Sequence, residues 1–274
     1  MDRDRSSDRF LEVNRELWDS LVPIHKRSRF YDLDGFLEGK SSLQAIEREE
    51  VGPVEGRGLL HLQCHFGMDT LSWARLGAEV TGVDFSPRAI EEACALRDRL
   101  KLPAEFICCD LYDLPLHLEK RFQIVYTSYG VLCWLPDLPR WGQIVAHFLE
   151  AGGRFVLVEG HPFLNVFANG SQESSLRIAY SYFHQPEPTR WEVDGDYADP
   201  QAQVNLPSYE WTHSFADILN ALLQAGLELE SLREFPWAMD QCFPFLEQRP
   251  DSFWQIPGGV NSIPMLFSLR MRKK

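Results

Sequence analysis

The chain has no long hydrophobic run and little basic charge. Its first ten residues, MDRDRSSDRF, carry several charges, and no later stretch approaches the roughly 20 apolar residues of a membrane-spanning helix. Lysine and arginine together number 27, against 40 aspartates and glutamates, for a formal net charge of −13 at pH 7. Proteins that bind nucleic acid usually carry a basic surface that neutralises phosphates. We therefore expect a cytoplasmic protein that binds neither membranes nor nucleic acid.

The 6 cysteines lack both the C-x-x-C spacing of many metal and redox sites and the density of a disulfide-rich scaffold. We expect reduced thiols and no metal site, although Cys108 and Cys109 are adjacent. The sequence also lacks internal repeats and low-complexity tracts. Its length of 274 residues and its regular alternation of strand and helix patterns predict a single domain over residues 1–274.

The most informative pattern is LLHLQCHFGMDTLSWARLGAEVTGVD at residues 59–84. The apolar run at 58–62 predicts a buried strand, a turn follows at 63–67, and residues 68–76 have the pattern of a helix. A second β-rich run then ends at Asp84. In open α/β folds this order builds a nucleotide pocket, because amides at the helix N-terminus attract a carboxylate and the acid binds both ribose hydroxyls.

The glycine pattern of this turn separates two classes of nucleotide site. A dinucleotide fingerprint requires G-x-G-x-x-G so that a pyrophosphate can contact the backbone, but Gln63, His65 and Met68 occupy the corresponding positions. Only Gly67 is present, and a glycine there allows a ligand to approach the backbone closely. The turn therefore disfavours NAD and FAD.

The rest of the chain predicts a parallel α/β sheet with two additions. Helices are expected over 8–22, 42–50, 87–100, 138–149 and 214–225, and further strands over 79–83, 104–108, 122–127, 153–159, 227–235 and 263–270. Pro23 is expected to end the first helix. Residues 1–55 form an N-terminal helical lid in this interpretation. Residues 160–212, where periodicity fades and aromatic residues gather, form an insertion between the fifth strand and the following helix.

The pattern LLHLQCHFG with its following helix resembles motif I of the class I S-adenosylmethionine (SAM)-dependent methyltransferases, and VTGVDFSPRAI resembles their next block. His61, Gln63 and His65 depart from the common form D-x-G-x-G-x-G and match a bacterial subgroup of small-molecule-type enzymes that reads LQCHFG. The resemblance covers roughly the central half of the chain. It implies SAM as the cofactor and a Rossmann-like α/β fold, with a seven-stranded, mostly parallel sheet, helices on both faces and an antiparallel last strand.

The resemblance also assigns residues to the cofactor. Asp84 would bind the ribose, Asp110 would accept the adenine amino group, and Tyr129 or Gly130 in YTSYGVL would contact the cofactor near its methionine end. A solvated loop acid is the alternative interpretation of Asp110. The expected cofactor residues are Trp18, His25, Tyr31, Gln63, Cys64, His65, Gly67, Asp84, Phe85, Ser86, Cys109, Asp110, Leu111, Tyr129 and Gly130.

Three of these residues come from the N-terminal segment. Trp18, His25 and Tyr31 fit the subgroup pattern N-x-x-x-W-D with a following histidine and aromatic residue. The resemblance implies that they form a lid over SAM. Simple packing of Trp18 on the sheet is the alternative.

Methyl transfer from a sulfonium draws its driving force from the cofactor, so the protein mainly aligns the reacting atoms and excludes water. A general base is optional, and His161 and His213 are candidates for an acceptor that must lose a proton. Each is more typical of a structural histidine. The aromatic residues of the insertion suit an apolar or planar acceptor, and equally suit packing on the core or a homodimer contact. We expect a monomer or a homodimer.

The sequence thus predicts a SAM-dependent methyltransferase that acts on an unidentified, small-molecule acceptor. The chain lacks the N-P-P-Y and D-P-P-Y motifs of nucleic-acid amino-methyltransferases and the Pro-Cys nucleophile of cytosine C5 enzymes. A noncatalytic or regulatory protein that binds SAM or S-adenosylhomocysteine is the alternative, motivated by the unusual turn at Gln63 and His65 and the lack of an obvious base. A nicotinamide oxidoreductase is a third hypothesis, which NADH binding would reveal.

Overall fold

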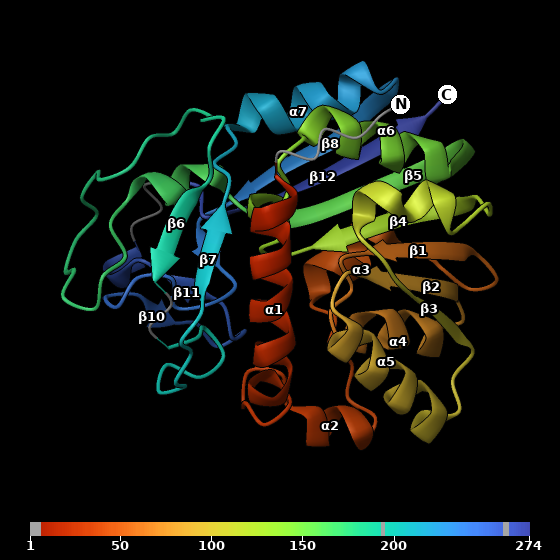
Figure 1. Ribbon diagram of the computed structural model, residues 1–274, viewed down its shortest axis with the longest axis horizontal. Coiled ribbons are helices and arrows are strands. Elements are labelled where there is room, and N and C mark those ends of the chain that lie inside the picture. The colour runs from red at the N-terminus through yellow and green to blue at the C-terminus, as the bar shows by residue number, and fades with distance from the viewer. Residues whose placement is uncertain (1–6, 193–194, 260–262) are drawn as a thin grey trace.

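The computed structural model describes residues 7–192, 195–259 and 263–274. Its centre is a 7-stranded sheet in the order β3-β2-β1-β4-β5-β12-β8 (Figure 1). The strands are β1 Gly58–Leu62, β2 Glu79–Asp84, β3 Ala104–Cys108, β4 Phe122–Ser128, β5 Leu149–Gly160, β8 Leu227–Phe235 and β12 Leu266–Lys273. Strands β1 to β5 run parallel, and β12 lies antiparallel to both β5 and β8. The predicted sheet, with its antiparallel last strand, is confirmed.

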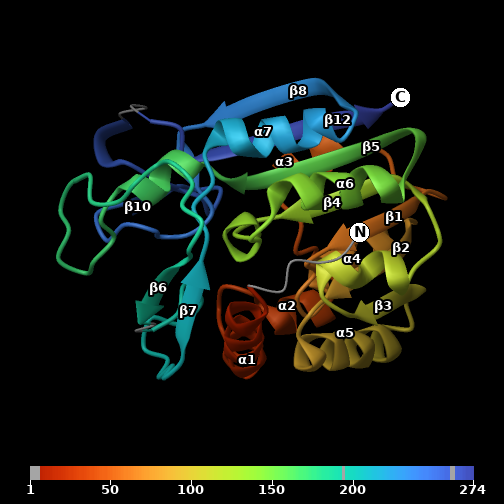
Figure 2. The same ribbon diagram turned by 45° about the horizontal axis from the view of Figure 1, so that its top comes forward.

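Helices lie on both faces of this sheet (Figure 2). The helices around it are α3 Ala45–Val51, α4 Met68–Arg75, α5 Pro87–Leu100, α6 Leu138–Phe148 and α7 Phe215–Gln224. On one face, α6 and α7 bury Trp141 against Phe155 of β5. On the other, α3 and α4 pack on the sheet, with Trp73 against Tyr126 of β4. Because the central strands are covered on both faces, their sequences are almost continuously apolar.

Local sequence signals fix the starts of two helices. Ser86 and Pro87 begin α5, and the Ser86 hydroxyl accepts a hydrogen bond from the Ala89 amide at 3.0 Å. Ser214 and Asp217 form a capping box at the start of α7. Both helix starts agree with the sequence patterns.

The first helix, α1, is longer than the sequence predicts. It runs over Asp8–His25 and contains Pro23. The prediction that Pro23 ends this helix is wrong. A proline lacks an amide hydrogen and crowds the carbonyl four residues earlier, but the Lys26 amide still donates to the Val22 carbonyl at 3.0 Å and closes the last turn. A short helix that the sequence analysis did not predict, α2 Leu33–Leu37, follows.

Two small sheets lie outside the central one. The segment after β5 forms the antiparallel pair β6 Thr189–Glu192 and β7 Pro207–Glu210. After β8, the strands β9 Trp237–Ala238, β10 Glu247–Gln248 and β11 Trp254–Gln255 form the other. Strands of 2 to 4 residues are too short to show an alternating pattern, so the sequence analysis did not predict them.

Two polar residues of the N-x-x-x-W-D motif hold α1 in place. The Asn14 side chain donates to the Tyr209 carbonyl at 2.7 Å and accepts from the Tyr209 amide at 2.8 Å, which ties α1 to β7. Asp19 accepts hydrogen bonds from the Ser86 hydroxyl and from the Arg88 amide, which ties α1 to the start of α5. Figure 1 accordingly shows α1, in red, between β7 and α5.

Other element ends differ from the predictions by a few residues. The last strand begins at Leu266 instead of 263, because Pro264 has no amide to donate to a ladder, and it continues to Lys273 against β8. β5 begins at Leu149, directly after α6, instead of 153. Within the described part of the chain, no helix is both long and apolar enough to cross a bilayer. The cysteines are free thiols.

Candidate active site

A cavity of about 560 Å³ opens at the carboxyl ends of β1 to β4. The expected cofactor residues that line it are Trp18, Tyr31, Gln63, Cys64, His65, Gly67, Asp84, Phe85, Cys109, Asp110, Leu111, Tyr129 and Gly130. His25 and Ser86 do not line it, because His25 is bonded to His65 behind the wall and Ser86 caps α5. Since ligands of open α/β sheets bind outside the carboxyl ends of the strands, this cavity is the candidate cofactor site.

The turn after β1 keeps a glycine-like backbone at two positions that are not glycine. Gln63 and His65 have φ values of 56° and 50°, and Gly67 has a φ of 80°. Residues other than glycine adopt this left-handed region at a cost in free energy. Backbone strain of this kind persists only where surrounding contacts hold it, and such positions cluster at functional sites. Gln63 and His65 thus place side chains at the edge of the cavity, at two positions where the common motif has glycine.

The neighbours of Gly67 require a glycine. A Cβ at this position would lie 2.8 Å from two ring carbons of Phe106 and 2.9 Å from the Cβ of Ala93. The sequence pattern attributes this glycine to close approach of a ligand, whereas the contacts that exclude a side chain come from β3 and α5. Gly67 precedes α4, whose first turn faces the same cavity through Met68 and Asp69.

Asp84 is buried at the end of β2, and its carboxylate is held in place by two amides. The His65 amide donates to Oδ2 at 2.8 Å, and the Ser86 amide donates to Oδ1 at 2.9 Å. Burial raises the pKa of this carboxyl to about 6, and the backbone hydrogen bonds oppose that rise. A carboxylate oxygen accepts two hydrogen bonds, so each oxygen has the capacity for a further donor such as a hydroxyl.

The turn after β3 joins a carboxylate to an apolar wall. Asp110 accepts a hydrogen bond from the Tyr112 amide at 2.8 Å and begins a short 3-10 helix over Leu111–Leu116. Burial raises the pKa of the Cys109 thiol to about 12, so this side chain stays uncharged. A polar acceptor beside apolar groups suits a flat heterocycle with an amino group.

A buried carboxylate positions the turn after β4. Glu159, near the end of β5, accepts hydrogen bonds from the amides of Gly130, of Val131 at 2.8 Å and of Leu132 at 3.3 Å. Burial raises the pKa of Glu159, and these bonds oppose the rise. Tyr129, at the tip of this turn, has a φ of 45°. Glu159 therefore fixes the YTSYGVL segment against the cavity.

Four residues that line the cavity each hold a buried polar atom without a hydrogen-bond partner within the described residues. The atoms are Nε1 of Trp18, Oε1 of Gln63, Nδ1 of His65 and the hydroxyl of Tyr129. Leaving a buried polar atom unpaired costs about 1 to 3 kcal/mol. A cluster of such atoms around one cavity indicates a site that is built for a polar ligand.

The formal charges that line this cavity are negative. The acidic residues are Asp32, Glu47, Asp69, Asp84, Asp110 and Asp240. Neither lysine nor arginine occurs among the lining residues that the structure describes. Burial raises the pKa of Glu47 and of Asp69, and the Tyr126 hydroxyl donates to Glu47 at 2.7 Å. This wall favours a positively charged ligand and disfavours an anionic one.

Behind the wall, two histidines and an aspartate form a hydrogen-bonded chain. His25 is fully buried at the end of α1, and its Nδ1 lies 2.8 Å from Nε2 of His65. The other nitrogen of His25, Nε2, lies 3.0 Å from Oδ1 of Asp196. The structure thus brings the three residues of the expected lid together. The ring of Tyr31 stacks on that of His25 with centroids 5.0 Å apart, and the ring centroid of Trp18 lies 5.9 Å from that of His25.

The two candidate bases lie away from this cavity. Nε2 of His161 is 3.0 Å from Glu234, and its ring stacks on Phe215. His213 bonds to the Leu135 carbonyl at 2.7 Å, and burial lowers its pKa to about 4. Neither histidine is a lining residue. Their contacts therefore favour the structural interpretation of both.

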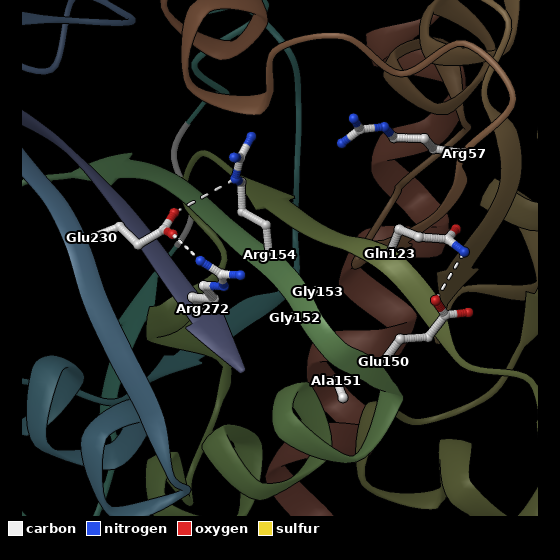
Figure 3. Close-up of a pocket in the computed structure, with 9 residues that line it drawn as sticks. All are labelled: Arg57, Gln123, Glu150, Ala151, Gly152, Gly153, Arg154, Glu230 and Arg272. Carbon is white, nitrogen blue, oxygen red and sulfur yellow. Dashed lines mark hydrogen bonds and ion pairs between the residues drawn. The ribbon is translucent and has the colours of Figure 1, made fainter. Parts of the chain in front are cut away.

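A second cavity, of about 280 Å³, opens at the opposite ends of the strands, beside the start of β5 (Figure 3). It is lined by Arg57, Gln123, Glu150, Ala151, Gly152, Gly153, Arg154, Glu230 and Arg272. Glu230 lies 3.7 Å from Arg154 and 3.9 Å from Arg272. Figure 3 shows both ion pairs as dashed lines. Gln123 donates to Glu150 at 2.9 Å. Because most of the charged groups here are paired with one another and the motif residues lie elsewhere, the first cavity is the candidate active site.

The structure places further acids at the site that the sequence analysis did not identify. Glu47, Asp69 and Asp240 line the cavity, Glu159 holds one of its turns, and Asp196 bonds to His25. A sequence signal exists for Asp69, because it follows the turn in the first helical turn of α4. Asp196 and Asp240 lie in segments without periodicity, where no pattern marks a residue.

Comparison with known proteins agrees with this geometry. The model of the methyltransferase domain family matches residues 59–153. A ubiquinone biosynthesis O-methyltransferase of Alkalilimnicola ehrlichii is 26% identical over 182 residues, which span 62% of this chain and 73% of that protein. An uncharacterised methyltransferase of Synechocystis is 30% identical over 125 residues, or 45% of this chain and 56% of that protein.

The fold is also similar to solved structures. The crystal structure of an S-adenosylmethionine-dependent methyltransferase from Mesorhizobium loti matches with a TM-score of 0.61 at 22% identity, and the match covers 86% of this chain and 100% of that one. The order of the seven strands and the cavity at the motif I turn agree with the family match. The chain is therefore a SAM-dependent methyltransferase with the class I fold.

Proposed function

We propose that this methyltransferase transfers the methyl group of SAM to a small, apolar or planar acceptor that carries no negative charge. The observation that carries the proposal is the composition of the cavity wall, which combines acidic and aromatic residues and has no lysine or arginine within its described lining. The name of the A. ehrlichii relative, an O-methyltransferase of ubiquinone biosynthesis, supports a hydroxyl group as the acceptor.

The residues of the cavity fit SAM at several points. Asp84 has acceptor capacity for the ribose hydroxyls, and Asp110 with Leu111 suits the adenine. Burial raises the pKa of Glu47 and Asp69 in the free protein, and a bound ammonium group or sulfonium opposes this rise and favours their negatively charged forms. When bound, SAM supplies an activated methyl group. The protein's own residues then bind and orient the two reactants and exclude water. This alignment accounts for most of their contribution to the rate.

Aromatic side chains supply the wall available to an acceptor. Trp18 and Trp134 meet edge to face with ring centroids 5.4 Å apart, and Phe30 and Tyr197 also line the cavity. Such walls bind planar apolar groups through buried area and ring contacts. A phosphate or carboxylate on the acceptor would leave its charge without a cationic partner in a partly buried site, at a large cost in free energy.

We also propose that residues 1–55 act as a lid and that residues 160–212 are an insertion that completes the acceptor side of the cavity. Support comes from Trp18 on α1 and from Tyr197 between β6 and β7, which both line the cavity. The hydrogen bonds of Asn14 to β7 join the two additions. The proposed assembly is a monomer or a homodimer, and light scattering after gel filtration distinguishes them.

Two measurements test the proposed function in order. Isothermal titration calorimetry with SAM and S-adenosylhomocysteine should show binding by the wild type and a strong loss in Asp84→Ala. A panel of phenols, amines, carboxylic acids and prenyl diphosphates, with release of S-adenosylhomocysteine as the readout, then tests the acceptor. Turnover of phenols or amines supports the proposal, and turnover confined to anionic compounds contradicts it. Cofactor binding with no turnover of any acceptor would favour the noncatalytic alternative.

A further inference from the structure

Hydrogen-bonding rules constrain the protons of the chain formed by Asp196, His25 and His65, which we call the histidine chain. An ionised aspartate only accepts, so Nε2 of His25 carries the hydrogen that bonds to Asp196 at 3.0 Å. Nδ1 of His25 and Nε2 of His65 are 2.8 Å apart, so one donates and the other accepts. Nδ1 of His65 has no partner in the described part of the chain, and His65 lines the cavity.

The histidine chain therefore has two states that differ by one proton. In the neutral state His65 donates to His25, and Nδ1 of His65 is a bare acceptor. In the charged state His25 is an imidazolium that donates to both Asp196 and His65, and Nδ1 of His65 becomes a donor. Burial, and next the charge of His25, lower the pKa of His65, so the His65 ring is the neutral member of the chain in both states.

The carboxylate of SAM is best bound by a cationic hydrogen-bond donor, and the other described residues of the cavity do not supply one. The described lining contains no lysine or arginine. Its other histidine, His61, bonds to Thr70 at 2.8 Å, and burial lowers its pKa to about 3, so it stays neutral. The His65 amide already donates to Asp84, which places His65 next to the expected ribose site.

We propose that Nδ1 of His65 donates a hydrogen bond to the carboxylate of SAM, and that binding of this carboxylate draws one proton into the histidine chain. The inference rests on the SAM site described under the proposed function. In the neutral state the bare nitrogen repels a carboxylate, whereas the charged state offers an N–H donor with the imidazolium of His25 behind it. The contribution of the carboxylate to affinity therefore falls as the pH rises.

Other titratable groups face the histidine chain from the elements packed around it. They are Tyr31 before α2, Tyr197 next to Asp196, Asp84 at the end of β2, Asp69 on α4 and Asp240 after β9. Burial raises the pKa of both tyrosines, so they stay protonated near neutral pH. Burial also raises the pKa of the three aspartates, that of Asp84 to about 6. Because these acids also exchange protons when a cation binds, the test must isolate the carboxylate.

Decarboxylated SAM isolates it, because this compound keeps the adenine, ribose, sulfonium and amine of SAM. The protein of 274 residues is titrated with both compounds by calorimetry, in buffers of different ionisation enthalpy, from pH 6.0 to 7.0. In this range the α-amino group of SAM, with a pKa of about 8, and the more basic amine of decarboxylated SAM are both protonated. We expect SAM to take up about one proton more than decarboxylated SAM, and the ratio of their association constants to fall by up to about tenfold per pH unit as the pH rises. Equal proton counts with a constant ratio would overturn the proposal.

Two variants assign the extra proton to the histidine chain. His65→Asn removes the imidazole at a backbone position with a φ of 50°, which asparagine tolerates better than most residues. Asp196→Asn leaves His65 in place but removes the anion that stabilises the charged state. Both should lose the proton difference between the two compounds, while His117→Asn, at an exposed site outside the cavity, should keep it.

The outcomes separate this inference from the proposed function. If both variants keep the wild-type proton difference, the carboxylate binds elsewhere and the inference fails. If the wild type binds both compounds with equal proton counts, the cofactor site stands and the inference alone fails. If the folded wild type binds neither compound, the SAM site itself is removed, and the inference fails with it.

Discussion

The hydrogen bonds of Asp84 set the size of the effect expected from replacing it. A carboxylate has about four acceptor positions, and the amides of His65 and Ser86 use two of them. Asp84→Asn keeps the size of the side chain, removes its charge and turns one oxygen into a donor that opposes an amide. A hydrogen bond to a charged group contributes about 1.5 to 3 kcal/mol. With two ribose hydroxyls affected in part, we expect a loss of about 3 kcal/mol, or binding of S-adenosylhomocysteine that is roughly 150-fold weaker.

The pKa of Asp84 adds a dependence on pH to this prediction. Burial raises it to about 6 in the free protein, so the carboxyl is protonated below that pH and ionised above it. Protonation removes an acceptor of the ribose hydroxyls. Binding by the wild type should therefore weaken below pH 6, by up to about tenfold per pH unit for this one group. Asp84→Asn should show a shallower fall, because Glu47 and Asp69 still titrate.

Calorimetric titration with S-adenosylhomocysteine from pH 5 to 8 measures both effects. Asp98→Asn is the matched control, since its side chain on α5 is 70% exposed and lies outside the cavity. Circular dichroism and the thermal midpoint of each variant establish that it is folded. A folded Asp84→Asn that binds within about threefold of the wild type, a difference of about 0.7 kcal/mol, would refute the assignment of the ribose to this carboxylate.

Three further substitutions test the supports of the site. Gly67→Ala should lower the free energy of unfolding by about 2 kcal/mol or more, because its Cβ would clash with its neighbours and its φ is strained. Gly170→Ala, whose Cβ meets nothing within 4 Å, is the control, and equal urea midpoints for the two variants would contradict the contacts of Gly67. Glu159→Gln should weaken SAM binding by about 1 to 3 kcal/mol, and unchanged titrations would show that its turn does not touch the cofactor. Asn14→Ala should speed hydrogen exchange at the Tyr209 amide, and retained protection would mean that α1 is held by other contacts.

The strand, turn, helix and acid up to Asp84 could be predicted because the signal is local. A buried run, a turn with Gly67 and an acid at the next strand end occur within a few tens of residues, and the sheet brings such strand ends together. The length of α1 could not be predicted from Pro23 alone, because the effect of a proline depends on the remaining amides of the last turn. Here the hydrogen bonds of the last turn, and not the presence of a proline, decide where the helix ends.

The acids that support the site could not be predicted, because their partners are distant in sequence. Glu159 acts on the turn after β4, and Asp196 bonds to His25 across a separation of 171 residues. Residue type alone was also a poor guide to a base, since His161 and His213 are bonded to Glu234 and to a backbone carbonyl away from the cavity. The contacts of a histidine, which only the tertiary structure supplies, decide what it can do.

The departure from the common motif I pattern and the helix α1 form one structural unit. His65 replaces a glycine of that pattern, and its ring finds its partner in His25 at the end of α1. Replacing His65 by glycine should relieve a left-handed strain of about 1 to 2 kcal/mol, but it leaves Nδ1 of His25 buried without this partner. A double-mutant cycle of His65→Gly and His25→Gln, followed by urea unfolding, should therefore give a coupling of about 1 to 2 kcal/mol. Effects that add within about 0.5 kcal/mol would show instead that motif I and α1 are independent.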